Sequence, residues 1–362
     1  MVDEPFFPCY NASKIYQKGG QTDGYYLLRG KAQKHTEIYY KGIRMKKKNV
    51  FVVLFALAMV MAGSLLCGNA APQIDHDSAS SVAETAAVAS ANVKQLEGAG
   101  TVNDPYLIYN EEDLNDIRNY TVYDTATRST LINGYFELTS SIALESDWVP
   151  IPYTFNGTLD GNLFTIIGMS MNVNAAGSYG LFKINKGTVR DLFFSNVHVN
   201  VTANQGATIT VGAVAATNYG TITNCTLASS NINLKNYYGA FLGGIAGTCY
   251  GGTVSNCEVV STCSLTSSGY IGGITAYVRY AIVTNCENSA EVNYSYNTTE
   301  RAIGGIAGIF EYGGTISYCT NSGTVRTSMS GGSIGQIVGI YDQYGSMIGN
   351  THNGSIIKNA NI

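Results

Sequence analysis

Short stretches of alternating apolar and polar residues recur along most of this chain. Each copy contains one stretch like Gly-Gly-Ile-Ala-Gly and, several residues later, one like Gly-Thr-Ile-Ser-Asn-Cys, with apolar side chains at alternate positions. A period of two is typical of half-buried β-strands, and the copies lack the apolar stripe of a helix. Successive copies begin 29 to 32 residues apart, at Gly180, Gly212, Gly243, Gly272, Gly304 and Gly335.

This repeat predicts the fold. A unit with two or three short strands cannot bury its apolar face alone, so neighbouring units must stack in register. Units that close into a spiral in this way form an all-β fold, the parallel β-helix, with Gly and Asn at corners that require a positive φ. With an atypical first coil at 155–169, residues 149–354 predict about seven coils. A β-propeller or a β-sandwich would need longer units or hairpin turns between equal strands.

Residues 98–148 precede the repeats and have a different pattern. Residues 103–108 predict a strand, and residues 110–117 predict a short helix with Asn110 as its N-cap and an acidic first turn. The open end of a solenoid exposes unpaired strand edges and apolar core, so we expect this segment to cover that end. The C-terminal tail, residues 355–362, has no comparable pattern, which leaves the other end to a partner or to a truncated region.

Residues 45–70 have the three parts of a secretory signal peptide. Met45 and three lysines precede an apolar run at 50–66, and Gly68 and Ala70 take the small-residue positions before a cleavage site. The segment therefore predicts export to a secreted or cell-surface location. Two alternatives stay open, namely an uncleaved membrane span of minimal length and lipid attachment at Cys67.

Residues 1–44 and 71–97 are not expected to contribute to the fold. The first segment lacks apolar periodicity, and the codons of Lys41 and Gly42 can encode a bacterial ribosome-binding tract shortly before Met45. We therefore interpret residues 1–44 as upstream sequence, with translation starting at Met45. Residues 71–97 are mostly Ala, Ser, Val and Thr and predict a linker.

The charge of the chain argues against nucleic acid and anionic lipid as partners. The 362 residues include 21 Lys and Arg against 25 Asp and Glu, and charged residues make up 13%. Residues 1–48 contain 10 of the basic and 4 of the acidic residues. Residues 49–362 therefore have 11 basic and 21 acidic residues, which gives them a net charge of −10. We therefore expect no binding to nucleic acid or to anionic lipid. Low charge, together with abundant Gly, Asn, Thr, Ser and Tyr, indicates an extracellular all-β protein.

Four cysteines take the same place in successive copies: Cys225, Cys257, Cys286 and Cys319. In a β-helix they form an inward column, which we interpret as a structural ladder of small buried side chains. Disulfides between neighbouring coils are the alternative that export permits, although in-register parallel strands give poor bond geometry. A metal column would lack the usual C-x₂₋₄-C spacing and partner histidines, so neither a metal nor a cofactor is predicted.

Five tyrosines recur 7, 7, 8, 8 and 9 residues after the first glycine of their copies: Tyr219, Tyr250, Tyr280, Tyr312 and Tyr344. They predict an aromatic ladder along one edge of the rod. Two roles are open for it. Stacked rings can stabilise the turns by packing on one another, or they can present a rigid apolar face with a polar tip to a sugar or protein ligand.

Candidate catalytic groups are sparse. Glu258 and Glu287 each follow a cysteine of the ladder and should lie one coil apart, near the separation of a retaining carboxylate pair. Neither has an Arg or a second acid at a neighbouring repeat position, so we interpret both as surface residues. Asp160 predicts a turn, and Arg190 with Asp191 predicts a solvent-facing pair. We expect no enzyme activity, with a β-helix polysaccharide lyase or glycoside hydrolase as the alternative.

The repeats resemble the GLUG-motif family of bacterial secreted and cell-surface proteins. The resemblance covers Gly180 to about Asn350, and residues 100–108 and 155–162 are similar to the lead-in and opening coil of the same proteins. It implies a right-handed β-helix and an adhesin-like role, in some members as the repeat region of immunoglobulin A peptidases. The zinc-protease motif of those peptidases, His-Glu-x-x-His, does not occur in this sequence.

Together these features predict a secreted or cell-surface β-helix that acts as a non-catalytic binding or adhesion rod. The expected partner is an extracellular glycan or a host or matrix protein, with no membrane contact after signal cleavage. The tyrosine ladder and the variable segments 231–238, 261–270 and 294–301 are the candidate contact regions. A structural spacer of a larger surface assembly is a further alternative.

Overall fold

The computed structural model describes residues 38–40, 43–45, 95–203, 208–235, 239–295, 301–328 and 333–358. The chain divides into two compact units, Met1–Val93 and Lys94–Ile362. In the first unit, β1 (Ile38–Tyr40) and β2 (Ile43–Met45) pair in antiparallel orientation. The upstream segment, the signal peptide and the linker lie almost entirely outside the described residues, so these interpretations stay predictions.

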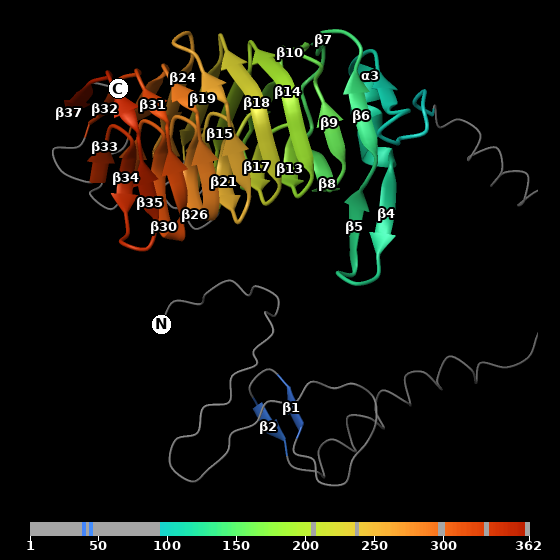
Figure 1. Cartoon of the computed structure of the whole chain (residues 1–362), viewed down its shortest axis with the longest axis horizontal. Helices are drawn as coiled ribbons and strands as arrows, with labels where there is room; N and C mark the ends of the chain where they lie inside the picture. The colour runs from blue at the N-terminus through green and yellow to red at the C-terminus, as the bar shows by residue number, and fades with distance from the viewer. Residues whose placement is uncertain are drawn as a thin grey trace, which may run out of the picture. The chain divides into compact units, whose positions relative to one another are not determined.

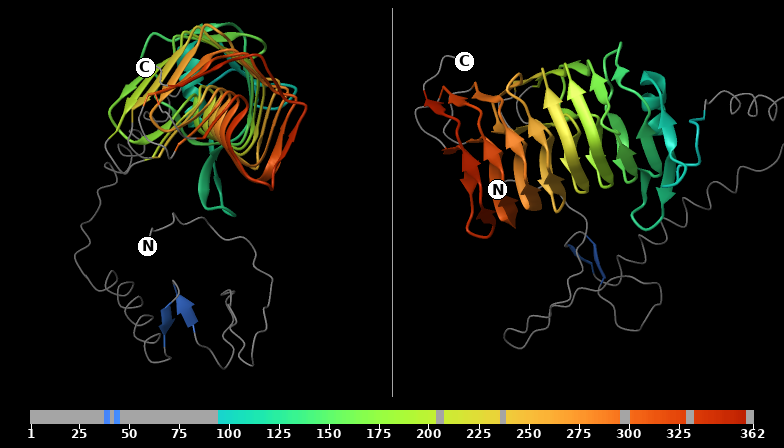
Figure 2. Two further views of the ribbon diagram at one scale, coloured as in Figure 1. Left: turned by 90° about the vertical axis from the view of Figure 1, so that its left-hand side faces the viewer. Right: turned by 45° about the horizontal axis from the view of Figure 1, so that its top comes forward.

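The second unit is a parallel β-helix (Figure 1), and its coils superimpose when the rod is viewed from its end (Figure 2, left). One sheet takes a strand from each of seven coils: β11 (Ser170–Val173), β15 (His198–Thr202), β19 (Asn231–Lys235), β24 (Ser264–Ser267), β28 (Glu291–Tyr294), β32 (Val325–Thr327) and β37 (Ile356–Lys358). A second sheet contains β12 (Gly177–Tyr179), β16 (Ile209–Val211), β20 (Ala240–Gly243), β25 (Tyr270–Gly272), β29 (Ala302–Gly304) and β33 (Ser333–Gly335).

The third sheet has 22 strands and bends around the remaining sides of the coils. It enters each coil with β8 (Ile151–Phe155), β13 (Phe182–Asn185), β17 (Ala215–Asn218), β21 (Ala246–Tyr250), β26 (Thr275–Thr284), β30 (Ala307–Ser317) or β34 (Val338–Tyr341). It continues through β9 (Thr158–Asp160), β10 (Thr165–Ile167), β14 (Thr188–Ser195), β18 (Thr221–Ala228), β22 (Thr253–Ser255), β23 (Glu258–Val259), β27 (Glu287–Asn288), β31 (Thr320–Asn321), β35 (Ser346–Ile348) and β36 (Thr351–His352). The predicted parallel β-helix of about seven coils is confirmed.

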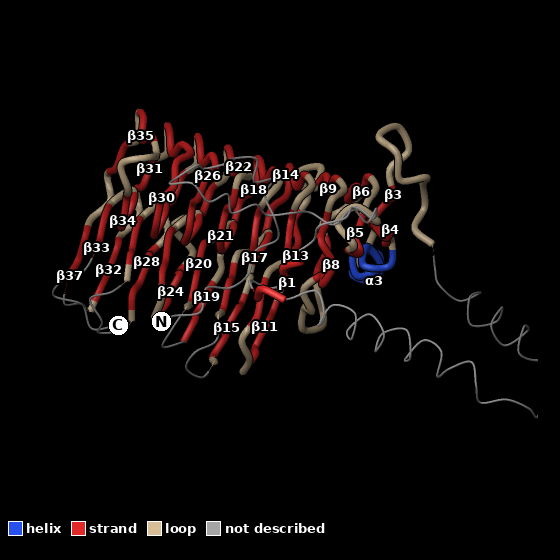
Figure 3. The backbone as a smooth tube through the Cα atoms, turned by 90° about the horizontal axis from the view of Figure 1, so that it is seen from below, coloured by secondary structure: helices blue, strands red, loops and turns tan. Residues whose placement is uncertain are grey.

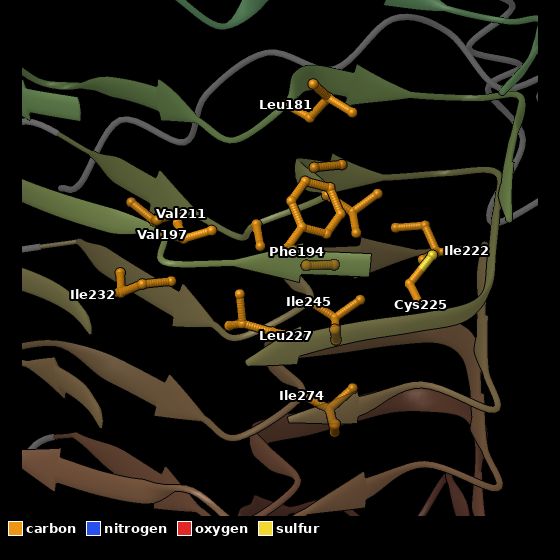
Figure 4. Close-up of a cluster of buried hydrophobic side chains, with 14 of the residues drawn as sticks. Leu181, Phe194, Val197, Val211, Ile222, Cys225, Leu227, Ile232, Ile245 and Ile274 are labelled. Carbon is orange, nitrogen blue, oxygen red and sulfur yellow. The ribbon is translucent and has the colours of Figure 1, made fainter. Parts of the chain in front are cut away.

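The coils stack in register, so residues at one repeat position form a column along the rod. Val199, Ile232, Leu265, Val292 and Val325 pair in succession and are at most 2% exposed. Figure 4 shows another part of this core, where Phe194 of one coil lies near Ile222 and Cys225 of the next. Each such aliphatic side chain contributes about 1.5–3 kcal/mol by its removal from water.

The corner before the cysteine column depends on a left-handed backbone conformation. Asn224, Asn256 and Asn285 have φ values of 53°, 52° and 52°, and Tyr318 takes the same place with φ 53°. Asparagine tolerates this conformation better than most residues because its short side chain hydrogen-bonds locally. The corner turns the next residue inward, which explains why a small apolar cysteine follows it.

Residues 95–143 cover the first coil. The segment contains β3 (Tyr106–Ile108), α3 (Glu111–Asp116), the 3₁₀ turn Ile117–Asn119, and the antiparallel pair β4 (Thr121–Asp124) and β5 (Ser129–Ile132) (Figure 3). The Asn110 side chain accepts the N–H of Asp113, as an N-cap does, and Leu114 is fully buried. This confirms the predicted short capped helix.

The cap also begins the solenoid. β5, β6 (Tyr135–Leu138) and β7 (Ile142–Ala143) pair in parallel with β8, β9 and β10, so an incomplete coil precedes the first full one. At the other end, residues 356–358 of the predicted tail form β37 in the last coil. Its inward Ile356 is 37% exposed, whereas Val325, the residue paired with it, is fully buried.

Candidate functional site: an outer aromatic cluster

A close approach between two sheets builds the surface on which the aromatic side chains meet. A Cβ on Gly247 of β21 would lie 2.9 Å from the backbone nitrogen of Val211 in β16. A Cβ on Gly308 of β30 would lie 2.9 Å from the carbonyl oxygen of Ile271 in β25. The last glycine of the Gly-Gly-Ile-Ala-Gly stretch therefore lets the strand that enters the 22-stranded sheet lie against the outside of the six-stranded sheet.

Outward side chains of the two sheets consequently pack on one another outside the core. Phe241 of β20 lies 5.2 Å from Tyr270 of β25 and 6.0 Å from Tyr277 of β26, measured between ring centroids. Tyr277 is 5.3 Å from Tyr250, which stacks on Tyr219 at 5.7 Å. We call these five residues the outer aromatic cluster. Its exposed fraction rises from 8% at Tyr277 to 38% at Tyr219, so its inner part is packed and its outer part faces solvent.

Charged groups border the cluster. The Tyr277 hydroxyl donates to the Glu311 carboxylate at 2.6 Å, and Glu311 is the strand partner of Arg279. The Arg279 guanidinium lies 4.2 Å from the ring centroid of Tyr312 and 5.5 Å from that of Tyr280. These distances are typical of cation–π contacts.

A second arginine borders the cluster on the six-stranded sheet. The guanidinium of Arg301 lies 5.0 Å above the ring of Tyr270 and donates to the Tyr270 hydroxyl at 3.3 Å. The two arginines and Glu311 therefore place hydrogen-bonding groups beside aromatic faces.

The single tyrosine ladder predicted from the sequence is wrong in its register. Tyr219 and Tyr250 stack at 5.7 Å, but the strand partner of Tyr250 is Arg279, not Tyr280. Tyr280 contacts Tyr312 at 6.2 Å as a second, tilted pair. Tyr280 takes the register position of Gly251, one residue after Tyr250, because the pairs Tyr250–Arg279 and Thr253–Ile282 have the same offset. Tyr280 and Tyr312 lie within β26 and β30, whose pairing shifts register between Arg279 and Ala281. Tyr344, one residue later again, is 71% exposed.

The displaced tyrosines have an unfavourable backbone conformation. Tyr280 and Tyr312 have φ values of 51° and 62°, and they are 61% and 46% exposed. A positive φ is uncommon for bulky residues and costs of order 1–2 kcal/mol relative to glycine. Neither ring is buried deeply enough for core packing alone to account for tyrosine at these corners.

Tyr250 and Tyr277 keep their hydroxyl protons at physiological pH, because the pKa of each hydroxyl is raised. Burial raises the pKa of Tyr250 to about 12. Burial, and then the hydrogen bond to Glu311, raises the pKa of Tyr277 further above its ordinary value. These hydroxyls can therefore act as hydrogen-bond donors across the physiological pH range.

The four cysteines of the predicted ladder lie inside the coils. Cys225, Cys257, Cys286 and Cys319 are free thiols and are at most 1% exposed. Each thiol lies 3.2–3.4 Å from the carbonyl oxygen two residues before it. Burial raises the pKa of Cys257 and of Cys286 well above the ordinary value of a thiol. The enclosed thiols of Cys257 and Cys286 therefore stay protonated, which makes them poor nucleophiles and poor metal ligands.

The candidate acids Glu258 and Glu287 lie near each other on the outside of the rod. Glu258 and Glu287 are strand partners on neighbouring coils, and the Ser289 hydroxyl donates to Glu287 at 3.3 Å. Arg190 pairs with Asp160 at 2.5 Å and approaches Asp191 only to 3.9 Å. Over the described ranges, no group of three or more His, Cys, Asp or Glu residues could hold a metal ion. In that same part of the chain, no helix is long and apolar enough to span a membrane.

Tyr270 and Arg301 are the last residues of two variable segments that the sequence predicted as contact regions, 261–270 and 294–301. Four further residues of this surface were not predicted: Phe241, Tyr277, Arg279 and Glu311. Phe241 had a sequence signal, because it stands two residues before the first glycine of a copy, as Tyr270 does. The other three depend on which outward positions of two sheets meet, and the spacing along the chain does not contain that information.

The fold and this surface define a class: a repeat-built parallel β-solenoid with aromatic and charged side chains on its outer face. A model of the GLUG motif matches residues 299–326, which confirms the predicted resemblance to GLUG-motif proteins. The matched segment includes β29, all of β30 with Glu311 and Tyr312, and β31.

Two curated relatives share part of the sequence. A "Putative Gly-rich membrane protein" of Evansella cellulosilytica is 33% identical over 140 residues, which are 35% of this chain and 15% of that protein. Halomucin of Haloquadratum walsbyi is 32% identical over 158 residues, which are 40% of this chain and 2% of that protein. The chain thus corresponds to only a small part of either relative.

A solved structure shares the fold. It is described as a "putative immunoglobulin A1 protease" from Bacteroides ovatus and has a TM-score of 0.54 at 19% identity. The match covers 72% of this chain and 79% of that one. At this level of identity the likeness concerns the fold alone.

Proposed function

We propose that this chain is a secreted or cell-surface β-helix that binds an extracellular glycan or protein without catalysis, through the outer aromatic cluster and the neighbouring Arg279, Tyr280 and Tyr312. The observation that carries the proposal is the position of Tyr280 and Tyr312, which are exposed, have a positive φ and enclose Arg279. Strained residues on a rigid scaffold are typical of functional sites, because selection for stability alone removes them.

A surface location is supported by the relatives. One is described as a membrane protein and another as a halomucin, and each matches part of this chain. The apolar segment at 50–66 and the low charge of the remaining chain agree with export. The proposal covers both a secreted protein and one held at the cell surface.

The catalytic alternative has less support. A glycoside hydrolase needs two carboxylates with different pKa values on either side of the scissile bond. Glu258 and Glu287 lie next to each other on one open face, at equivalent positions of successive coils. Such a pair has no evident division into acid and nucleophile.

The test is an array of glycans and mucin-type proteins incubated with the full 362-residue chain, with released reducing ends assayed in the same wells. The proposal predicts saturable binding without release of sugar ends. Release of sugar ends would support the enzyme and direct attention to Glu258 and Glu287. Absence of binding and of release would favour the structural spacer.

A further inference from the structure

Arg279 has the geometry of a ligand-binding arginine. Two tyrosine rings lie against its guanidinium, at 4.2 Å and 5.5 Å, and the side chain is half-buried. Such contacts fix the plane of the guanidinium and leave its N–H edge available. Among the described residues, no carboxylate lies within 4.0 Å of the Arg279 guanidinium, unlike those of Arg190 and Arg326.

Glu311 supplies acceptors next to these donors. It pairs with Arg279 across β26 and β30, at the strand spacing of about 4.8 Å. The Tyr277 hydroxyl donates to one oxygen of the Glu311 carboxylate, which orients the group. A carboxylate has about four acceptor sites, so capacity remains for another donor.

Aromatic side chains flank this donor–acceptor pair along the strands. Tyr250 is the strand partner of Arg279 on the preceding coil, and Tyr277 stands two residues before Arg279 in β26. Tyr280 and Tyr312 directly follow Arg279 and Glu311 in β26 and β30 and contact each other. A ligand that fits must offer a face of C–H groups together with neighbouring groups that both donate and accept hydrogen bonds. Pairs of hydroxyls on a sugar ring have this chemistry.

We infer that Arg279 and Glu311 form the specificity site of the proposed binding face and select neutral sugars with adjacent hydroxyls. This inference rests on the proposed function and adds the ligand class. Arg279 donates to one hydroxyl oxygen, Glu311 accepts from its neighbour, and the tyrosine rings pack against the sugar.

The site disfavours acidic sugars. A ligand carboxylate that reached Arg279 would lie about one strand spacing from the Glu311 carboxylate, and like charges at that distance repel. The charge of −10 on residues 49–362 acts in the same direction at longer range. Glu311 is therefore the residue that excludes anions, and Arg279 is the anchor.

The test compares neutral oligosaccharides with the same oligosaccharides oxidised at C6 to uronic acids, with the full chain as binder. Wild type should bind the neutral form at least about tenfold more tightly, the size expected for one charge-dependent contact. Glu311→Gln keeps an acceptor for Tyr277 but removes the charge, so it should bring the two affinities to within about threefold of each other. Arg279→Met should lose about tenfold or more for the neutral form.

Tyr123→Ala is the control. Tyr123 is 64% exposed on β4 of the N-terminal cap, whereas Arg279 and Glu311 lie several coils later in the rod. Thermal unfolding of every variant separates lost binding from lost folding. Arg279→Lys keeps the positive charge and should recover part of the affinity that Arg279→Met loses. A preference for the oxidised sugars, or a Glu311→Gln variant with wild-type discrimination, would overturn the inference and leave the proposed function intact. If wild type binds neither sugars nor proteins, both are overturned.

Discussion

The inner cysteine column and the outer tyrosines are spaced almost identically along the sequence, yet the structure treats them differently. Cys225, Cys257, Cys286 and Cys319 occupy one continuous column inside four successive coils. The tyrosines, which follow the same repeat, divide into two pairs and one separate residue.

The difference shows what fixes the register of a solenoid. An inward position is constrained by the strand pairings around it and by the core that it must fill, so an extra residue cannot be accommodated there. The outward tyrosines are less constrained, because Tyr280 takes the register position of Gly251 and the β26–β30 pairing shifts register beside Tyr280 and Tyr312, which both have a positive φ. The identity of an inward residue is therefore set by stability, whereas an outward residue beside a register shift is free to acquire function.

The largest expected effect is from a charge placed in the inner column. Cys257→Asp buries a carboxylate without a partner and should lower the free energy of unfolding by about 3–5 kcal/mol or prevent folding. Chemical denaturation measures the change. The matched control is Asn256→Asp, which adds the same charge one residue earlier at an exposed corner and should change stability little. Equal losses in both variants would contradict the inward assignment.

A smaller loss is expected at high pH. Burial raises the pKa of Cys249 to about 11 from its ordinary value of 9.0, so the folded state holds this proton more tightly than the unfolded state does. The stabilisation is complete below pH 9 and is lost as the pH rises toward 11, by about 2–3 kcal/mol. Denaturation curves at pH 8 and pH 11 test this, and Cys249→Ala should remove that part of the pH dependence.

The sequence was sufficient to predict the fold but not the arrangement of the site, and the reason is physical. The coils and the inner cysteines follow from one-dimensional periodicity, because an alternating pattern and a fixed repeat specify which side chains face inward. The cluster around Tyr277 requires two sheets to touch from the outside, and Gly247 and Gly308 permit this through the absence of a side chain. Contacts of this kind depend on the bend between sheets, which the repeat length does not encode.

Stacking within the outer aromatic cluster should have a moderate effect. Tyr250 contacts both Tyr219 and Tyr277, so Tyr250→Ala should lower the free energy of unfolding by about 1–3 kcal/mol, the sum of two ring contacts. Tyr250→Phe keeps the ring and should recover most of the loss. Wild-type stability in Tyr250→Ala would indicate that the rings do not pack in solution as they do here.

The smallest effect is expected at Tyr344, the last of the five repeat tyrosines. Tyr344 is 71% exposed, and Tyr344→Ala should change the free energy of unfolding by less than about 0.5 kcal/mol. A loss comparable to that of Tyr250→Ala would mean that the tyrosines form one continuous ladder after all. The same denaturation experiment measures both variants.

The central claim is that Tyr280 and Tyr312 are retained for binding, at a cost in stability. The most direct measurement pairs ligand binding with thermal unfolding in the double variant Tyr280→Asn/Tyr312→Asn, with the ligand taken from the glycan and protein array. Asparagine tolerates the positive φ at both positions. We therefore expect an unchanged or higher unfolding temperature together with at least about tenfold weaker binding. Wild-type binding, or unfolding of the variant at a much lower temperature, would contradict it.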